Sequence, residues 1–171
     1  MARQPKTKKE RVSDNRLFTL DVLITDGPMT DEFAKKNPII SRTIQILGSQ
    51  TLEHLHKAIF KAFDREDPHM YEFQIGGKSP RDDKAKRYVM PVAVKEPYTR
   101  NAPAGTVNRT TIGSLGLKVN DRFSYWFDFG DDWWHQIKVV AIGASAPKEK
   151  YPKVANRVGE SPPQYIDWEE E

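Results

Sequence analysis

The hydrophobic pattern of the chain predicts two strands near its N-terminal end. Apolar and mixed positions alternate over residues 16–25, as in a strand with one buried face. The apolar set is Phe18, Leu20, Val22 and Ile24. A second β-branched run covers residues 39–47, and its positions of like parity are Ile40, Arg42, Ile44 and Ile46. Residues 26–37 are polar and predict a connection between the two strands.

The pattern then changes to a helical period over residues 51–63. Its apolar positions recur at spacings of three and four, which places them on one stripe of a helix. They are Leu52, Leu55, Ile59 and Phe63. Either Ser49 or Thr51 is suited to cap the helix, and Glu53 falls in its first turn.

The rest of the chain predicts further strands. Residues 69–75 read as a strand ended by two glycines, and 87–94 as a short strand broken by Pro91. Residues 111–117 predict a turn or a single helical turn, followed by an aromatic strand, an acidic turn and a strand at 136–142. Strands on both sides of one helix predict an α+β fold, with a mixed or mainly antiparallel sheet and the helix packed on one face.

Charge and composition divide the chain into three parts. Residues 1–16 carry six basic and two acidic side chains, whereas the remainder carries 21 basic and 22 acidic ones. We therefore expect a disordered basic tail at 1–14, one domain at 15–143 and a Pro-rich acidic extension at 144–171. The tail suits weak, salt-sensitive contact with nucleic acid, and a solvated disordered leader is the simpler and favoured explanation.

The composition also excludes several classes of site. The chain has no cysteine, which rules out disulfides and thiolate metal sites. No apolar run approaches the roughly 20 residues of a membrane span, and no apolar signal region follows Met1. These features are typical of a cytoplasmic protein with no membrane contact.

The richest chemistry lies in residues 123–135, which predict a strand, a tight acidic turn and a returning strand. Two pairings fit this segment. If Asp131 is the centre of the turn, Phe127 opposes His135, and His135 lies on a buried face. If Gly130 and Asp131 form a two-residue loop, Trp126 opposes His135 instead. The ionisable and aromatic residues of the turn are Asp128, Asp131, Asp132, Trp133, Trp134 and His135.

The histidines suggest a metal site as one interpretation. His56 falls within the apolar stripe of the helix, so it could meet His135 or His69 beside Asp128. Three such ligands and an open position would suit a catalytic zinc ion. A structural network of histidine and aspartate explains the same residues without a metal, and we expect no cofactor. An acid–base role for His135 would need an aspartate of raised pKa.

Two adjacent tryptophans on a strand point to opposite faces, so Trp133 or Trp134 could be exposed for a protein partner. The alternative is that one packs in the core and the other beneath the C-terminal extension. The neighbouring Asp131 and Asp132 would repel phosphate, which disfavours nucleic acid at this turn. The leading hypothesis is a binding module that uses residues 128–135, and the rival is a metal-assisted hydrolase.

The order of these features resembles the Ri-plasmid ORF-3-like family, also described as a transposon-passenger family. The resemblance is carried by the Thr-Leu-Glu-His-Leu-His start of the helix with Ala58-Ile59 and Ala62-Phe63, by His69–Phe73, and by Tyr125–Asp132 with Trp134 and His135. The family usually continues with Cys and Gly, then Pro-Pro-Glu-Asp and Gly-Gly. This chain keeps only the prolines, at Pro162 and Pro163. The resemblance implies an α+β fold and a mobile-element or prokaryotic cytoplasmic context, and it implies no reaction.

Overall fold

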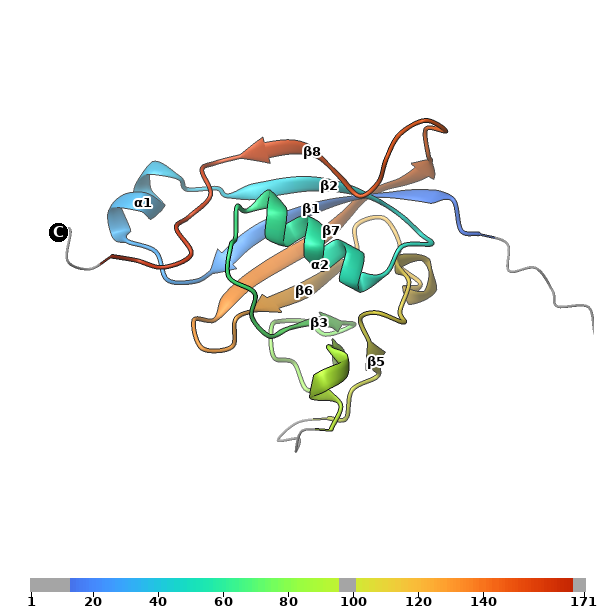
Figure 1. Ribbon diagram of the computed structural model, residues 1–171, viewed down its shortest axis with the longest axis horizontal. Helices are drawn as coiled ribbons and strands as arrows, with labels where there is room; N and C mark the ends of the chain where they lie inside the picture. The colour runs from blue at the N-terminus through green and yellow to red at the C-terminus, as the bar shows by residue number, and fades with distance from the viewer. Residues whose placement is uncertain (1–12, 96–100, 168–171) are drawn as a thin grey trace, which may run out of the picture.

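This computed structural model describes residues 13–95 and 101–167. Its strands form where apolar and polar residues alternate along the sequence or where β-branched residues follow one another. They are β1 (Arg16–Asp26), β2 (Ser41–Leu47), β3 (Tyr71–Ile75), β4 (Lys86–Val89), β5 (Gly105–Thr106), β6 (Arg122–Phe127), β7 (Trp133–Ala144) and β8 (Lys153–Val158). They make one sheet in the order β5-β4-β3-β6-β7-β1-β2-β8 (Figure 1). All neighbouring pairs are antiparallel except β4 and β5. The expected α+β class with a mainly antiparallel sheet is confirmed.

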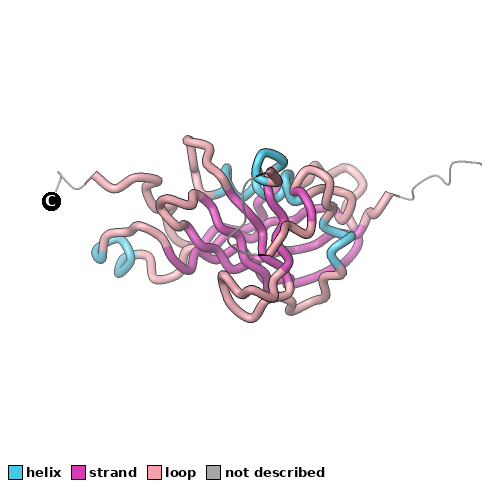
Figure 2. Tube along the Cα trace, turned by 90° about the horizontal axis from the view of Figure 1, so that it is seen from below, coloured by secondary structure: helices cyan, strands magenta, loops and turns pink. Residues whose placement is uncertain are grey.

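The predicted helix is α2 (Leu52–Ala62), which lies across one side of the curved layer of strands (Figures 1 and 2). Thr51 caps it: the Thr51 hydroxyl accepts from the His54 backbone N–H, and the His54 ring accepts from the Thr51 N–H at 2.9 Å. This reciprocal pair satisfies two backbone donors that a helix start leaves free.

Three shorter helical segments refine the expected connections. Helix α1 (Asp31–Lys36) lies within the predicted polar connection, where Thr30 caps it and accepts from the Phe33 N–H. The expected strand at 87–94 stops at Val89, and the 3-10 turn η1 (Pro91–Ala93) follows because proline cannot donate to a strand ladder. The predicted turn at 111–117 contains the 3-10 turn η2 (Ile112–Leu115).

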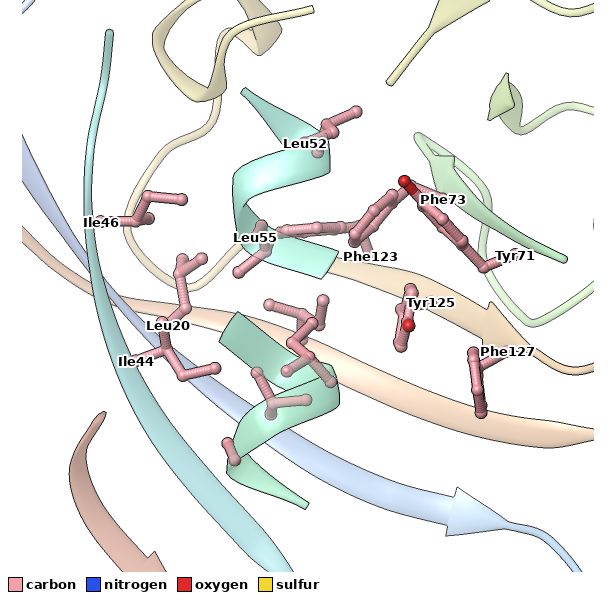
Figure 3. Close-up of a cluster of buried hydrophobic side chains, with 14 of the residues drawn as sticks. Leu20, Ile44, Ile46, Leu52, Leu55, Tyr71, Phe73, Phe123, Tyr125 and Phe127 are labelled. Carbon is pink, nitrogen blue, oxygen red and sulfur yellow. The ribbon is translucent and has the colours of Figure 1, made fainter. Parts of the chain in front are cut away.

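The core lies between α2 and the face of the sheet that it covers (Figure 3). The apolar stripe of α2 and the alternate positions of β1, β2, β3, β6 and β7 are buried together. Labelled members from the helix and four strands are Leu20, Ile44, Ile46, Leu52, Leu55, Tyr71, Phe73, Phe123, Tyr125 and Phe127. Burial of this apolar surface is the main force that holds the helix to the sheet.

The register of β6 and β7 differs from both predicted pairings. His135 lies opposite Tyr125, and the last pair before the loop is Phe127 with Trp133. Residues 128–132 therefore form a five-residue loop, with Asp128 and Asp132 both in the left-handed region at φ 59° and 58°. The Asp128 carboxylate accepts from the N–H groups of residues 130 and 131, which replaces ladder pairing inside the loop.

The C-terminal segment contributes more to the fold than its composition predicts. Residues 153–158 form β8, which pairs with β2 at one edge of the sheet. The buried guanidinium of Arg42, on β2, donates to the carbonyls of Val158 and Gly159 at 2.9 and 3.1 Å. Beyond β8, Gln164 accepts from the N–H groups of residues 66 and 67 at 3.0 and 3.1 Å. The segment after β8 is thus tied to the loop that follows α2.

The opposite side of the sheet, which we call the polar face, carries half-buried hydroxyl and amide side chains. Representative residues are Thr19, Thr43, Gln45, Ser124 and Gln136. The loop of residues 76–85 lies against part of this face, where Arg81 contacts the rings of Trp126 and Trp134.

Most of the basic tail expected at 1–14 lies outside the described residues. Asp14 is described: its carboxylate pairs with Arg16 at 2.8 Å, and its carbonyl accepts from the Ser49 N–H. In the part of the chain that the structure describes, no helix is long and apolar enough to cross a membrane.

Candidate functional site

Asp128 holds the end of the β6–β7 hairpin and is nearly buried. Besides its two backbone partners within the loop, its carboxylate lies 3.4 Å from the Nε2 atom of His69. The same His69 atom lies 2.8 Å from the hydroxyl of Tyr165 in the C-terminal segment. His69 therefore connects the hairpin to the C-terminal segment, which matches the expected structural contact between a histidine and an aspartate.

Neither of the adjacent tryptophans offers an exposed ring to a partner. Trp133 is fully buried on the α2 side of the sheet, where the Arg65 guanidinium lies 4.2 Å from its ring centroid. Trp134 is 5 % exposed on the polar face, where it stacks on Trp126 and not beneath the C-terminal segment. The expectation of an exposed tryptophan is thus wrong, because both faces of the sheet are covered at this end of β7.

His56, which is half-buried, and His135, which is buried, flank Tyr125. His56 stacks on Tyr71 with centroids 3.6 Å apart, and its Nδ1 lies 2.7 Å from the Tyr125 hydroxyl. The Nδ1 atom of His135 lies 3.2 Å from the Tyr125 carbonyl. Burial lowers the pKa of both histidines from 6.5 to about 3, so both are neutral near pH 7.

The residues proposed as metal ligands do not meet at one point. His69 and Asp128 are in contact, but His56 and His135 turn to opposite ends of Tyr125. Among residues 13–95 and 101–167, no group of three or more histidine and carboxylate side chains is placed to hold a metal ion. Asp131 is exposed in the loop, and Asp132 turns toward the polar face.

Aromatic side chains form a row on the polar face at the hairpin end. Phe129, Trp126 and Trp134 follow one another, with centroid separations of 4.1 and 5.0 Å. We call these three residues the aromatic row. Trp134 is buried, Trp126 is half-buried, and Phe129 is 37 % exposed. The row therefore presents an apolar edge to solvent.

Arg81 brings the loop of residues 76–85 over this row. Its guanidinium lies 5.6 and 5.3 Å from the ring centroids of Trp126 and Trp134, within the range of cation–π attraction. It also donates to the Asp132 carboxylate at 3.1 Å, and the Trp126 indole N–H donates to the same oxygen at 2.8 Å. Asp132 thus fixes both a ring and a guanidinium in place.

Two adjoining pockets lie beside the aromatic row, between the loop of residues 76–85 and the end of β1. The larger, of about 390 Å³, is lined by Thr25, Asp26, Pro80, Arg81 and Trp134. The other, of about 210 Å³, shares Thr25 and Pro80 with it. Its other polar lining residues are Gln74, Lys78, Ser79, Arg122, Ser124, His135 and Gln136. We call the two together the polar-face groove.

Several residues that line the groove were not predicted as site residues from the sequence. Lys78 and Arg81 belong to a basic stretch with no regular hydrophobic pattern, whereas Arg122 and Ser124 alternate with the core aromatics of β6. That alternation was a usable signal, because polar positions of β6 must share the face opposite the core. The placement of the loop had no comparable signal in its composition.

The comparisons with known proteins agree with the fold. The family model described as plasmid pRiA4b ORF-3-like protein matches residues 32–168, so the chain belongs to this family. The chain is similar to a solved structure from Methanosarcina mazei Go1, the protein of unknown function MM3350. The TM-score is 0.62 at 22 % identity, over 83 % of this chain and 69 % of that one. No curated protein matches the sequence.

Proposed function

We propose that the protein is a non-enzymatic binding module, associated with a mobile element, that holds a segment of a protein partner in the polar-face groove. The hairpin of residues 128–135 forms the aromatic end of this surface. The observation that carries the proposal is Arg81, which lines the groove and lies against the half-buried ring of Trp126. Tryptophan and arginine are the residues most enriched where protein partners bind tightly.

The arrangement of ionisable groups supports binding over catalysis. His56 is half-buried and His135 is buried, burial lowers the pKa of both, and the Nδ1 atom of each contacts Tyr125. Asp128 is occupied by backbone N–H groups of its own loop. General acid–base catalysis is most efficient when the pKa of the catalytic group lies near the working pH, and the pKa of about 3 for His56 and His135 lies far below neutral pH.

The two alternatives have weaker support. A metal-assisted hydrolase would use His56, His135 and an aspartate, which lie in separate contacts here. Nucleic-acid binding through residues 1–14 concerns a segment that lies almost wholly outside the described residues, and it stays a separate prediction. It would show a steep salt dependence that is lost when residues 1–14 are deleted.

The proposal requires variants that alter the surface without breaking the hairpin. Replacement of Trp134 or Asp132 would not do so, because Trp134 is buried and Asp132 positions both Arg81 and Trp126. Phe129→Ala and Arg81→Asn are better choices. Arg81 has a φ of 62°, and asparagine tolerates this left-handed conformation.

The test compares proteins captured from a cell extract by wild type, by the double variant and by a control. The control, Lys57→Gln, removes an exposed positive charge on α2, across the sheet from the groove. We expect a set of proteins that wild type and control retain and that the double variant loses. Equal capture by all three, with unchanged thermal unfolding, would contradict the proposed function.

A further inference from the structure

Positive charge collects at the smaller pocket of the polar-face groove. Lys78 and Arg122 both line this pocket, and Arg122 lies directly opposite Lys138 on the neighbouring strand. Like charges placed opposite each other in a sheet repel, which destabilises the pair. Within the described parts of the chain, none of these three side chains forms an ion pair.

Three carboxylates lie near these cations, and each accepts a hydrogen bond from another group. Asp82 accepts from the backbone N–H groups of Lys78 and Lys84, and these bonds lower its pKa together with the positive charges of the two lysines. Asp121 accepts from the backbone N–H of Lys118 at 2.9 Å. On the other side of Lys138, Asp21 accepts from the hydroxyl of Thr43 at 2.7 Å. The pocket itself is lined by no carboxylate.

Neutral donors complete the pocket. Ser79 and Ser124 supply hydroxyl groups, and Gln136 supplies an amide. An anion held between two cations and such donors receives charge-assisted hydrogen bonds, which are about twice as strong as neutral ones. This donor set suits an oxyanion.

The wall of the pocket is held in place before any ligand arrives. The backbone N–H of Arg81 donates to the side-chain carbonyl of Gln74 at 2.9 Å, which ties the loop to β3. The loop is also closely packed within itself, because a Cβ atom at Gly77 would lie 2.9 Å from the Cβ atom of Asp82. A fixed wall lowers the entropy that binding must overcome.

We propose that this pocket binds the carboxylate of an acidic residue in the bound partner segment, with Lys78 and Arg122 as its cationic contacts. The inference rests on the proposed function and names the chemistry that it recognises. The same partner segment places an apolar residue against the aromatic row. A nucleic-acid backbone fits less well, because Asp26 and Asp131 at the hairpin end would repel its repeated phosphates.

The test begins with random peptides displayed on phage and selected on the full-length protein. The best peptide is then synthesised, with a version in which its acidic residues become the matching amides. Affinities are measured by fluorescence anisotropy for wild type, Lys78→Gln with Arg122→Gln, Phe129→Ala with Arg81→Asn, and the Lys57→Gln control. Thermal unfolding of each variant confirms its fold.

We expect selected peptides to contain Asp or Glu beside an apolar residue. The Lys78→Gln and Arg122→Gln changes should weaken binding by at least about tenfold, as the loss of hydrogen bonds to a charged group implies. The amide peptide should bind wild type equally weakly. The affinity of the amide peptide should fall little further on the Lys78→Gln and Arg122→Gln variant, because the change in the peptide and the changes in the protein remove the same contact.

The contrary outcomes separate the two proposals. Selected peptides without acidic residues, or equal affinity for the Lys78→Gln and Arg122→Gln variant, would overturn the carboxylate pocket. The proposed function would still stand if Phe129→Ala with Arg81→Asn removed binding. Failure to select any peptide would overturn both. Displacement of the peptide by a single-stranded oligonucleotide would show that the pocket recognises phosphate instead.

Discussion

Trp126 of β6 and Trp134 of β7 lie directly opposite each other, with ring centroids 5.0 Å apart and ring planes 8° from parallel. Arg81 lies against both rings and bonds to Asp132, which also accepts from the Trp126 indole. The hairpin and the loop of residues 76–85 are therefore held as one unit. The recognition surface that we propose is built on this unit.

The stacked pair leads to a prediction about stability. Trp134→Ala removes a buried ring, so it should lower the free energy of unfolding by about 3–5 kcal/mol. Urea denaturation measures this loss. Phe129→Ala is the control at the exposed end of the same row, and it should cost under about 1 kcal/mol. Equal losses for both variants would show that Trp134 is not the structural member of the row.

A second prediction concerns the C-terminal segment. The Gln164 side chain accepts from the backbone N–H groups of Glu66 and Asp67, so Gln164→Ala should free both of them. Hydrogen exchange should then be faster at these two amides and unchanged at the α2 amide of Ile59. Protection of Glu66 and Asp67 that survives the change would mean that Gln164 does not tie down this loop.

A third prediction is a loss of stability in acid. The pKa values of His56 and His135 fall from 6.5 to about 3 on folding, so only the unfolded chain protonates them in this interval. Stability should therefore fall as pH drops below 6.5, by up to about 1.4 kcal/mol per pH unit for each histidine.

Carboxylates titrate over part of the same range, so a variant is needed to isolate the histidine effect. His56→Phe keeps a ring against Tyr71 but cannot take a proton. Its free energy of unfolding should depend less steeply on pH between 6.5 and about 3 than that of wild type. Parallel curves would contradict the lowered pKa of His56.

A fourth prediction concerns metal. The described residues bring no three histidine or carboxylate side chains together. A chelator should therefore leave the thermal unfolding temperature of the untagged protein unchanged. Stoichiometric metal in elemental analysis, with a fall in that temperature on chelation, would instead support the hydrolase alternative.

Local pattern was sufficient to predict the core of the fold. The alternation of Phe18, Leu20 and Val22 predicted β1, and the spacing of Leu55 and Ile59 predicted the buried side of α2, because both signals depend only on near neighbours. Strand β8 escaped prediction, since its residues are largely exposed and it depends on a distant partner. Arg42 was the available clue: a charge on an otherwise apolar strand face must find partners.

At the candidate site, the strands could be predicted from the sequence but the contacts of their side chains could not. The strand, turn and returning strand of residues 123–135 were predicted correctly, but their register depended on how Asp128 bonds within the loop. A shift of one residue exchanges the two faces of a strand. Without the register, the contacts of His135 could not be inferred. The approach of Arg81 to Trp134 joins distant segments, and the sequence carries no local sign of it.

The central claim is that the polar-face groove is the recognition surface, and chemical-shift mapping tests it most directly. An acidic peptide selected on the protein is titrated into isotope-labelled protein. We expect the largest changes at the Trp126 indole N–H and at the backbone amides of Lys78, Phe129 and Gln136, with the α2 amides of Lys57 and Lys61 unmoved. Changes confined to α2, with the Trp126 indole unmoved, would contradict the account.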